Sequence, residues 1–425
     1  NIIRSVYEDE SGTLYVGTRG GGLNIIEANT IATKIINSRN GLSNDAVLAL
    51  NKDHDGNIWV GLDGEGIDMM EARTNKIFHF PLDFENKNDL SFSSVYSICV
   101  DAFNDIWLGT SGYGIIHLKV IKTPQGKYRL KEYDQLQHSG KAKQISIKSN
   151  IVYAIVEEKP NMLWFGTRGG GIYRYNALTK EIEEHIQANA NEKNSLCNND
   201  VLSLYIDKQE QLWVGTSGGL NRLYLQSKPY RIDHYTQHEG LPNNTIHGIQ
   251  EDLNNNIWIS TNHGLVMYDR VKYSFKNFDN NDGLQNNEFT DGASFKSQLS
   301  EKLFFGGVDG LDIIYPTKLN TTNYFSRLTI TGFQVRNVNI SPGDASHILS
   351  QNIDFTDNIT LTYDQNFISL FFTTLDYWNK QKSEYAYFLE NFDKDWNYIG
   401  QQQSVTLTNI PPGHYTLKIK YSNEN

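Results

Sequence analysis

The sequence predicts an all-β protein, and its length, its composition and a repeated phrase carry that prediction. The 425 residues are too many for one ordinary core, because length divided by about 150 gives a prior near three domains. Aromatic residues make up 12% of the chain, and 34 Gly accompany only 4 Met. Such a composition is typical of short strands separated by tight turns.

The repeated phrase is an aliphatic residue, an aromatic residue, a second apolar residue and a glycine. Seven copies occur, at residues 14–17, 58–61, 106–109, 163–166, 212–215, 257–260 and 303–306. Their fourth positions are separated by 44, 48, 57, 49, 45 and 46 residues. This period is typical of a four-stranded propeller blade. Tyr15 and Phe304 replace Trp, and Ser260 replaces Gly.

Each copy lies within the same series of strands and turns. An apolar strand, a polar turn, the Trp strand, a Gly-rich turn and a further strand precede a variable segment, as in a four-stranded meander. Both faces of the Trp strand are apolar, so it needs a sheet on each side, which radially packed blades provide. We therefore predict a seven-bladed β-propeller at residues 1–316. The last blade shows three strands, and we expect its outer strand to come from residues upstream of Asn1.

Beyond Pro316 the Trp-Gly rhythm stops and a different strand pattern begins. Polar and apolar residues alternate at 359–363 and 415–421, and a Pro-Pro-Gly turn lies at 411–413. These features predict an immunoglobulin/fibronectin-like β-sandwich at residues 317–425. We expect its aromatic residues to pack in the sandwich, with the tyrosine hydroxyls bonded to the backbone: Tyr363, Tyr377, Tyr385, Tyr387, Trp396 and Tyr415.

Charge and hydropathy exclude several classes of protein. The formal net charge is -11, so we expect no nucleic-acid partner for this fragment. Mean hydropathy is -0.50, and no apolar run approaches the roughly 18 residues of a membrane helix. The two cysteines cannot form a disulfide framework. Because the chain starts within a strand-like pattern and without Met, we interpret it as a fragment.

The repeats resemble the two-component-regulator propeller repeat, in which a Leu-Trp-Val-Gly-Thr strand is followed by a Gly pair and another strand. The C-terminal region is similar to the triple-tyrosine domain that follows such propellers. The similarity rests on the aromatic runs at 367–372 and 385–389, on Leu375-Asp376-Tyr377, and on Trp396 and Pro412-Gly413-His414-Tyr415. The two resemblances cover nearly the whole chain.

The resemblance implies the periplasmic sensor region of a hybrid two-component system, here its second propeller and its sandwich. It implies an oligosaccharide ligand, control of carbohydrate-utilisation genes, and a homodimer formed through sandwich and propeller. A membrane helix and a histidine kinase would follow outside this chain and tether it to the inner membrane. The chain itself would not be an enzyme.

Ligand-binding candidates lie on one predicted rim. The turns between second and third strands share a face with the crossovers to the next blade, and an Arg fork or an aromatic ring there suits an acidic group or a sugar ring. The candidates are Arg19, Asp63, Glu65, Tyr113, Arg168, His263 and Asp309. Solvated turn residues are the ordinary alternative for each of them.

A basic segment interrupts the acidic chain at residues 119–148, where eight Lys or Arg face only Glu132 and Asp134. It suggests a site for an acidic glycan or a partner surface. A solvated hairpin whose lysines protect a sheet edge from aggregation is the favoured interpretation.

A metal-dependent lyase and a protein-interaction scaffold are the rival functions. His247 and His263 belong to one blade, and Glu251 and Glu288 are nearby in sequence, but two histidines alone do not form a metal site. The glycine triplets precede no helix, so they provide no phosphate cradle. We therefore expect no cofactor, no metal and no catalytic residues.

Overall fold

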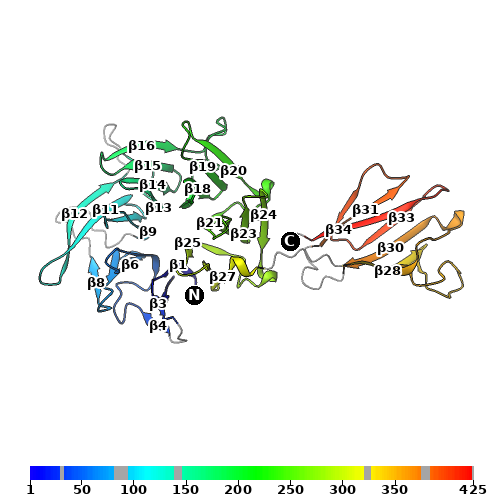
Figure 1. Ribbon diagram of the computed structural model, residues 1–425, viewed down its shortest axis with the longest axis horizontal. Helices are drawn as coiled ribbons and strands as arrows, with labels where there is room; N and C mark the ends of the chain where they lie inside the picture. Colours follow the sequence, from blue (N-terminus) through cyan, green and yellow to red (C-terminus); the bar gives the residue numbers. More distant parts are fainter. Residues whose placement is uncertain (29–32, 81–93, 138–145, 320–326, 375–382, 424–425) are drawn as a thin grey trace. The chain divides into compact units, whose positions relative to one another are not determined.

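The computed structural model describes residues 1–28, 33–80, 94–137, 146–319, 327–374 and 383–423. The chain divides into two compact units, Asn1–Leu319 and Asn320–Asn425 (Figure 1). This division lies three residues beyond the predicted one, after the short 3-10 turn Pro316–Lys318. Within the described ranges, no helix is long and apolar enough to span a membrane.

The first unit contains seven antiparallel sheets that follow one another around a ring (Figure 1). Their first strands are β1 (Ile3–Glu8), β5 (Val47–Lys52), β9 (Val95–Val100), β13 (Val152–Lys159), β17 (Val201–Ile206), β21 (Ile246–Glu251) and β25 (Phe289–Lys296). Their second strands are β2 (Leu14–Thr18), β6 (Ile58–Leu62), β10 (Ile106–Thr110), β14 (Met162–Thr167), β18 (Gln211–Thr216), β22 (Ile257–Thr261) and β26 (Leu303–Gly307).

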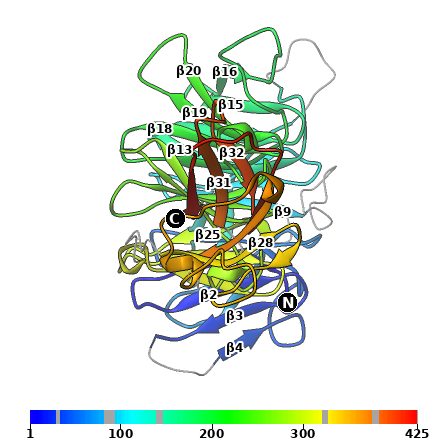
Figure 2. The same ribbon diagram turned by 90° about the vertical axis from the view of Figure 1, so that its right-hand side faces the viewer.

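The outer strands complete the blades. The third strands are β3 (Leu23–Ile26), β7 (Ile67–Met70), β11 (Ile115–Lys122), β15 (Gly171–Asn176), β19 (Gly219–Tyr224), β23 (Gly264–Asp269) and β27 (Leu311–Ile314). The fourth strands are β4 (Thr33–Ile36), β8 (Ile77–Phe80), β12 (Tyr128–Leu136), β16 (Glu181–Ile186), β20 (Arg231–Tyr235) and β24 (Ser274–Phe278). Figure 2 shows β2, β3 and β4 beside one another.

The ring is closed by packing between its first and last sheets. Strand β1 lies beside β25 and β26, and Ile3 and Val6 share a hydrophobic cluster with Ala293 and Phe304. The last sheet has three strands among the described residues, as expected. That an upstream segment supplies its fourth strand stays a prediction. The predicted seven-bladed all-β architecture is confirmed.

The repeated phrase is buried because each second strand lies between two neighbouring blades. Trp59, Trp164, Trp213 and Trp258 are almost completely buried. Each propeller cluster combines apolar residues of adjacent sheets, as when Trp213 packs with Ile246 and Ile257 of the next blade. This two-sided burial explains why the Trp strand lacks the polar alternation of a half-exposed strand.

The glycine that ends the phrase is required by close packing. A Cβ at Gly166 would lie 2.6 Å from Val201 Cγ1 at the start of the next inner strand. At Gly17 it would lie 2.5 Å from Val47 Cγ1. Side chains do not tolerate such distances, so glycine sets the spacing between blades.

A second repeated feature fixes the tryptophans. In five blades the indole Nε1 donates to a carboxylate six residues earlier in the chain. The pairs are Trp59–Asp53, Trp107–Asp101, Trp164–Glu158, Trp213–Asp207 and Trp258–Asp252, at 2.7 to 3.0 Å. The other oxygen of Asp53 also accepts from the backbone of the following turn, so one carboxylate holds turn and strand together.

The second unit consists of two antiparallel sheets around one core. One sheet has the order β29-β28-β30-β33, with β28 (Leu328–Val335), β29 (Val338–Asn339), β30 (Phe367–Thr374) and β33 (Ser404–Thr408). The other has the order β32-β31-β34, with β31 (Ser383–Glu390), β32 (Asn397–Gly400) and β34 (Thr416–Asn423). Phe333, Phe372, Tyr385 and Leu389 pack in the core between them, in agreement with the predicted sandwich.

The strand predicted at 359–363 is wrong. These residues are irregular, and Tyr363–Gln365 forms a 3-10 turn because Thr362 and Gln365 cap it reciprocally. Tyr363 is 80% exposed and does not pack in the sandwich as expected. Tyr415 meets the expectation, since its hydroxyl donates to the Pro411 carbonyl at 3.0 Å. Tyr377 lies outside the described residues.

Candidate functional site

In six blades the first strand, which is the inner strand of the propeller, carries a β-bulge at the same position. Pairing with the second strand skips one residue in each case. The skipped residues are Arg4, Leu48, Tyr96, Tyr153, Leu202 and His247. Bulges redirect a side chain and are frequent beside functional sites. Here they give the same end of each inner strand a residue that does not take part in the regular pairing.

The seventh blade has a larger irregularity at the same place. Phe289 pairs with Gly307 and Ser294 pairs with Phe305, so residues 290–293 oppose only Gly306. Gly292 has a φ of 74°, a conformation that favours glycine. The Thr290 hydroxyl donates to the Ile3 carbonyl and thereby joins the bulge to the first blade. Strand β25 also approaches β13 and β17 from the other side of the ring.

This bulge brings Asp291 to His247. His247 Nδ1 lies 2.5 Å from Asp291 Oδ1, and Nε2 lies 2.7 Å from Asn262 Oδ1. Burial acts to raise the pKa of Asp291, but the hydrogen bond from His247 and the charges of His247 and Arg4 outweigh it and lower the pKa. Asp291 is therefore held as a carboxylate, with His247 as its hydrogen-bond partner.

Two tyrosines face this group. The ring centroids of Tyr96 and Tyr153 are 4.9 Å apart, and both side chains are half-buried. Burial raises the pKa of the Tyr153 hydroxyl, the nearby charge of Arg168 opposes the shift, and Asp291 adds to it. Tyr153 thus lies within electrostatic range of both Arg168 and Asp291.

Arg4 completes the group, which we call the axial cluster: Arg4, Tyr96, Tyr153, Arg168, His247 and Asp291. The charge of Arg4 contributes to the low pKa of Asp291. Its Nε is nevertheless buried without an acceptor in the part of the chain that the structure describes. The cluster therefore combines two guanidinium groups, a carboxylate that is hydrogen-bonded to a histidine, and a pair of aromatic rings.

All seven predicted rim residues lie in turns between second and third strands. Because Ile3 pairs with Thr18 at the end of β2, these turns are on the same side of the propeller as the axial cluster. Tyr113 is half-buried and the other six are exposed. Of the seven, Arg168 interacts with a member of the axial cluster, Tyr153. Asp63 accepts instead from the Ser94 hydroxyl, and Asp309 accepts from the Asn286 amide. A role for each in ligand binding stays a prediction.

The basic segment forms a long hairpin of β11 and β12 in the third blade, while residues 138–145 lie outside the described residues. Lys122 pairs with Glu71 at 2.5 Å, and the Tyr128 hydroxyl donates to the same carboxylate at 3.0 Å. Together with a hydrogen bond from the Thr74 hydroxyl, these hydrogen bonds lower the pKa of Glu71 to about 2, and Lys122 contributes most. Lys127, Arg129 and Lys131 are exposed along β12. Part of the basic charge is thus used within the fold.

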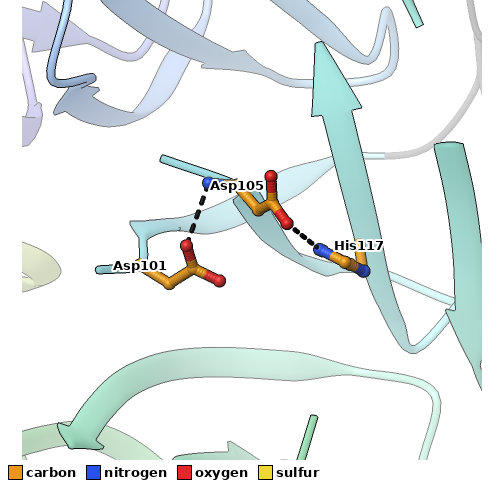
Figure 3. A group of neighbouring side chains, drawn as sticks. All are labelled: Asp101, Asp105 and His117. Atoms are coloured by element: carbon orange, nitrogen blue, oxygen red, sulfur yellow. Dashed lines mark hydrogen bonds and ion pairs between the residues drawn. The ribbon is translucent and has the colours of Figure 1, made fainter. Parts of the chain in front are cut away.

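A group with the composition of a metal site occurs at Asp101, Asp105 and His117 (Figure 3). The Asp101 carboxylate already accepts from Trp107 Nε1 and from the Asp105 backbone. The Lys119 ammonium lies 3.1 Å from Asp105 Oδ2, beside His117 at 3.2 Å. The His117 ring also stacks on Trp107, with centroids 4.2 Å apart. These contacts explain the cluster as part of the repeated Trp-carboxylate arrangement.

The groups considered for a lyase site are not brought together. Both nitrogens of His247 face Asp291 and Asn262. Glu251 is at the opposite end of β21, fully buried beside Arg270. The backbone N–H of His263 donates to Thr261, and its side chain is exposed.

Several members of the axial cluster are not evident from the sequence. Arg4, Tyr96, Tyr153 and Asp291 differ in type and occupy no repeated motif. Only their position in the strand could have indicated them, because the residue skipped at each bulge follows the first apolar residue of the inner strand. The four residues of the last bulge, 290–293, carry no such signal.

Family comparisons agree with the fold. The two component regulator propeller model matches residues 41–64, 89–112, 195–218 and 240–263, and the Y_Y_Y domain model matches residues 376–425. The chain thus carries two-component-regulator propeller repeats followed by a Y_Y_Y domain, which confirms the predicted resemblance.

Two relatives indicate the class of protein. The chain is 26% identical over 332 residues to histidine kinase P4 of Formosa agariphila, covering 67% of this chain and 24% of the relative. It is also similar to the extracellular domain of a protein assigned as a hybrid two-component system of B. thetaiotaomicron. There the identity is 26% and the TM-score 0.79, over 100% of this chain and 53% of the other. The chain is therefore similar in sequence to a histidine kinase and in sequence and fold to the extracellular domain of a two-component system.

The chain spans about half of that solved domain and about a quarter of the kinase. Virginiamycin B lyase from Staphylococcus aureus is 14% identical with a TM-score of 0.53, covering 73% of this chain and 93% of the lyase. That likeness shows a shared propeller fold.

Proposed function

We propose that this chain is the oligosaccharide-sensing part of a hybrid histidine kinase/response regulator that controls carbohydrate-utilisation genes. The observation that carries the proposal is the similarity of the whole of this chain to 53% of the extracellular domain of a hybrid two-component system, with a TM-score of 0.79. The same similarity supports a periplasmic location, with a membrane helix and kinase outside this chain.

The axial cluster is the proposed binding site. Half-buried tyrosine rings offer a face for a sugar ring, and guanidinium groups offer paired donors to its substituents. Loops and strand ends supported by a rigid scaffold are common positions for binding residues, and the closed ring of seven sheets is such a scaffold. The chain needs no catalytic residue for this role.

Signalling is proposed to proceed through a homodimer formed by sandwich and propeller. A ligand shifts an equilibrium between two dimer arrangements only by its difference in affinity for them. Moving the population from 1:99 to 99:1 requires about a 10⁴-fold preference. Small-angle scattering of the complete extracellular region, with and without a bound oligosaccharide, should therefore show a change in dimer geometry. An unchanged scattering curve at saturation would contradict this mechanism.

Calorimetric titration of the complete extracellular region against an oligosaccharide library tests the function itself. We expect saturable binding of one glycan class, weakened by replacing both tyrosines of the pair, Tyr96→Ala and Tyr153→Ala. The matched control is Tyr273→Ala, because Tyr273 is 76% exposed on the turn that leads into β24. Absence of glycan binding together with turnover of a cyclic peptide antibiotic that stops on chelation would favour a lyase. Tight binding to a protein partner would favour a scaffold.

A further inference from the structure

Two buried or half-buried arginines of the described propeller have side-chain nitrogens that are buried without an acceptor: Nε of Arg4, and Nε and Nη1 of Arg270. Arg4 differs from Arg270 and the others because its side chain has no hydrogen-bond partner among the described residues. Arg174 binds Glu158 and Glu183, Arg222 binds Gln211, and Arg270 binds Asp207. The Arg4 side chain makes no hydrogen bond within the described ranges, and its Nε is buried. An unsatisfied buried donor costs about 1–3 kcal/mol, more when charged, so the fold keeps this guanidinium at a cost.

The nearest carboxylate does not relieve Arg4. Asp291 lies close enough to interact electrostatically with Arg4, but the Asp291 carboxylate is hydrogen-bonded to His247. On the other side of the cluster, Arg168 adds a second guanidinium beside Tyr153. The rim carboxylates Asp63 and Asp309 are already hydrogen-bonded to Ser94 and Asn286, which precede β9 and β25. The positive charge at the axial cluster therefore exceeds the negative charge available to neutralise it.

We propose that the axial cluster binds an acidic oligosaccharide, whose carboxylate or sulfate is received by Arg4 while a neighbouring sugar ring contacts Tyr96 and Tyr153. An oxyanion of this kind accepts two parallel N–H bonds from one guanidinium. Because Nε is buried while Arg4 as a whole is half-buried, the oxyanion would bond the terminal Nη groups of the guanidinium, and Arg168 would add a second contact. This inference rests on the proposed function and specifies its ligand class.

The test compares oligosaccharides that differ only in their acidic groups. The probes are sulfated and uronic acid tetrasaccharides, with their desulfated and carboxyl-reduced counterparts, titrated by calorimetry into the complete extracellular region. We expect an acidic probe to bind more tightly than its neutral counterpart by about tenfold or more. Binding should weaken as salt concentration rises.

Variants of Arg4 identify the group responsible. Arg4→Gln should remove the preference for the acidic probe, and Arg4→Lys should retain part of it, because a lysine keeps the charge but loses the paired donors. Arg231→Gln is the matched control, since Arg231 is exposed on the outer strand β20. Arg168→Gln should weaken binding of the same probe and serves if an Arg4 variant does not fold.

A stability measurement separates binding from structure. If Arg4 is kept for a ligand, Arg4→Leu should leave the melting temperature of the ligand-free protein unchanged or raise it, while acidic binding is lost. A strong fall in melting temperature for both Arg4→Leu and Arg4→Gln would assign Arg4 a structural role and overturn the proposal. Binding of neutral glycans alone, or an acidic preference unaffected by Arg4→Gln, would overturn the proposal while leaving oligosaccharide sensing intact. No binding of any glycan would overturn both.

Discussion

Gly248 lies directly opposite Ser260 in the sixth blade, with glycine on the first strand and serine on the second, the reverse of the first and fifth blades. In the first blade Ser5 faces Gly17, and in the fifth Ser203 faces Gly215. A Cβ at Gly248 would lie 2.9 Å from Ser260 Oγ and 2.7 Å from Ser294 Cβ of the next blade. The pair therefore has room for one side chain, and the sixth blade places it on the second strand. This explains why the repeated phrase ends in serine there.

Replacing Gly248 by Ala should destabilise the propeller by about 1–3 kcal/mol, the range for overpacking a close-packed interior. Gly310→Ala is the control, because its added Cβ would meet only ordinary contacts, the nearest at 3.6 Å from Gln285 Cγ. Urea unfolding followed by tryptophan fluorescence measures both variants. Equal stability of the two would contradict the packing argument.

The Trp-carboxylate pairs predict that two aspartates of one turn differ in their contribution to stability. Asp53→Asn removes an acceptor for Trp59 Nε1 inside the protein and should cost about 1–3 kcal/mol. Asp55→Asn, in the same turn but exposed, should change stability by less than about 0.5 kcal/mol. Thermal unfolding of the two variants would refute the argument if they lost stability equally.

The two cysteines are free, and both should react slowly with thiol reagents. Burial raises the pKa of Cys99 to about 12 and that of Cys197 to about 11, so little thiolate exists near pH 8. Cys197, which is half-buried, should be alkylated before the buried Cys99. Mass spectrometry of protein treated with iodoacetamide, with urea-unfolded protein as the reference, gives the order. Faster labelling of Cys99 would show that its strand is not packed as described.

The His247–Asp291 pair predicts a pH-dependent contribution to stability. Because the pKa of Asp291 is lowered in the folded state, its stabilising effect is present above the unfolded carboxyl pKa of about 3.9 and is lost as the pH falls through the folded value. The stability difference between the native protein and Asp291→Asn should therefore be larger near pH 5.5 than near pH 3. Asp309→Asn, on an exposed turn of the same blade, is the control. A difference that is constant with pH would contradict the ion pair.

The repeats can be predicted from the sequence, but most members of the axial cluster cannot. Trp and Gly recur because every blade imposes the same burial on Trp213 and the same close approach on Gly166. The residues skipped at the bulges, such as Arg4 and Tyr153, are under no common packing constraint. They therefore share no sequence pattern. Arg168 can be predicted because its turn is part of the repeat. The strand predicted at 359–363 failed because local capping by Thr362 overrode the alternating pattern.

Hydrogen–deuterium exchange on the extracellular region, with and without a bound acidic oligosaccharide, tests the central claim most directly. The account predicts protection at the starts of the inner strands, including residues 2–5, 94–97, 151–154 and 246–248, and at the bulge 290–293. Arg4→Gln should abolish that protection. Protection confined to the opposite turns of the propeller, or to residues 327–423, would contradict a site at the axial cluster.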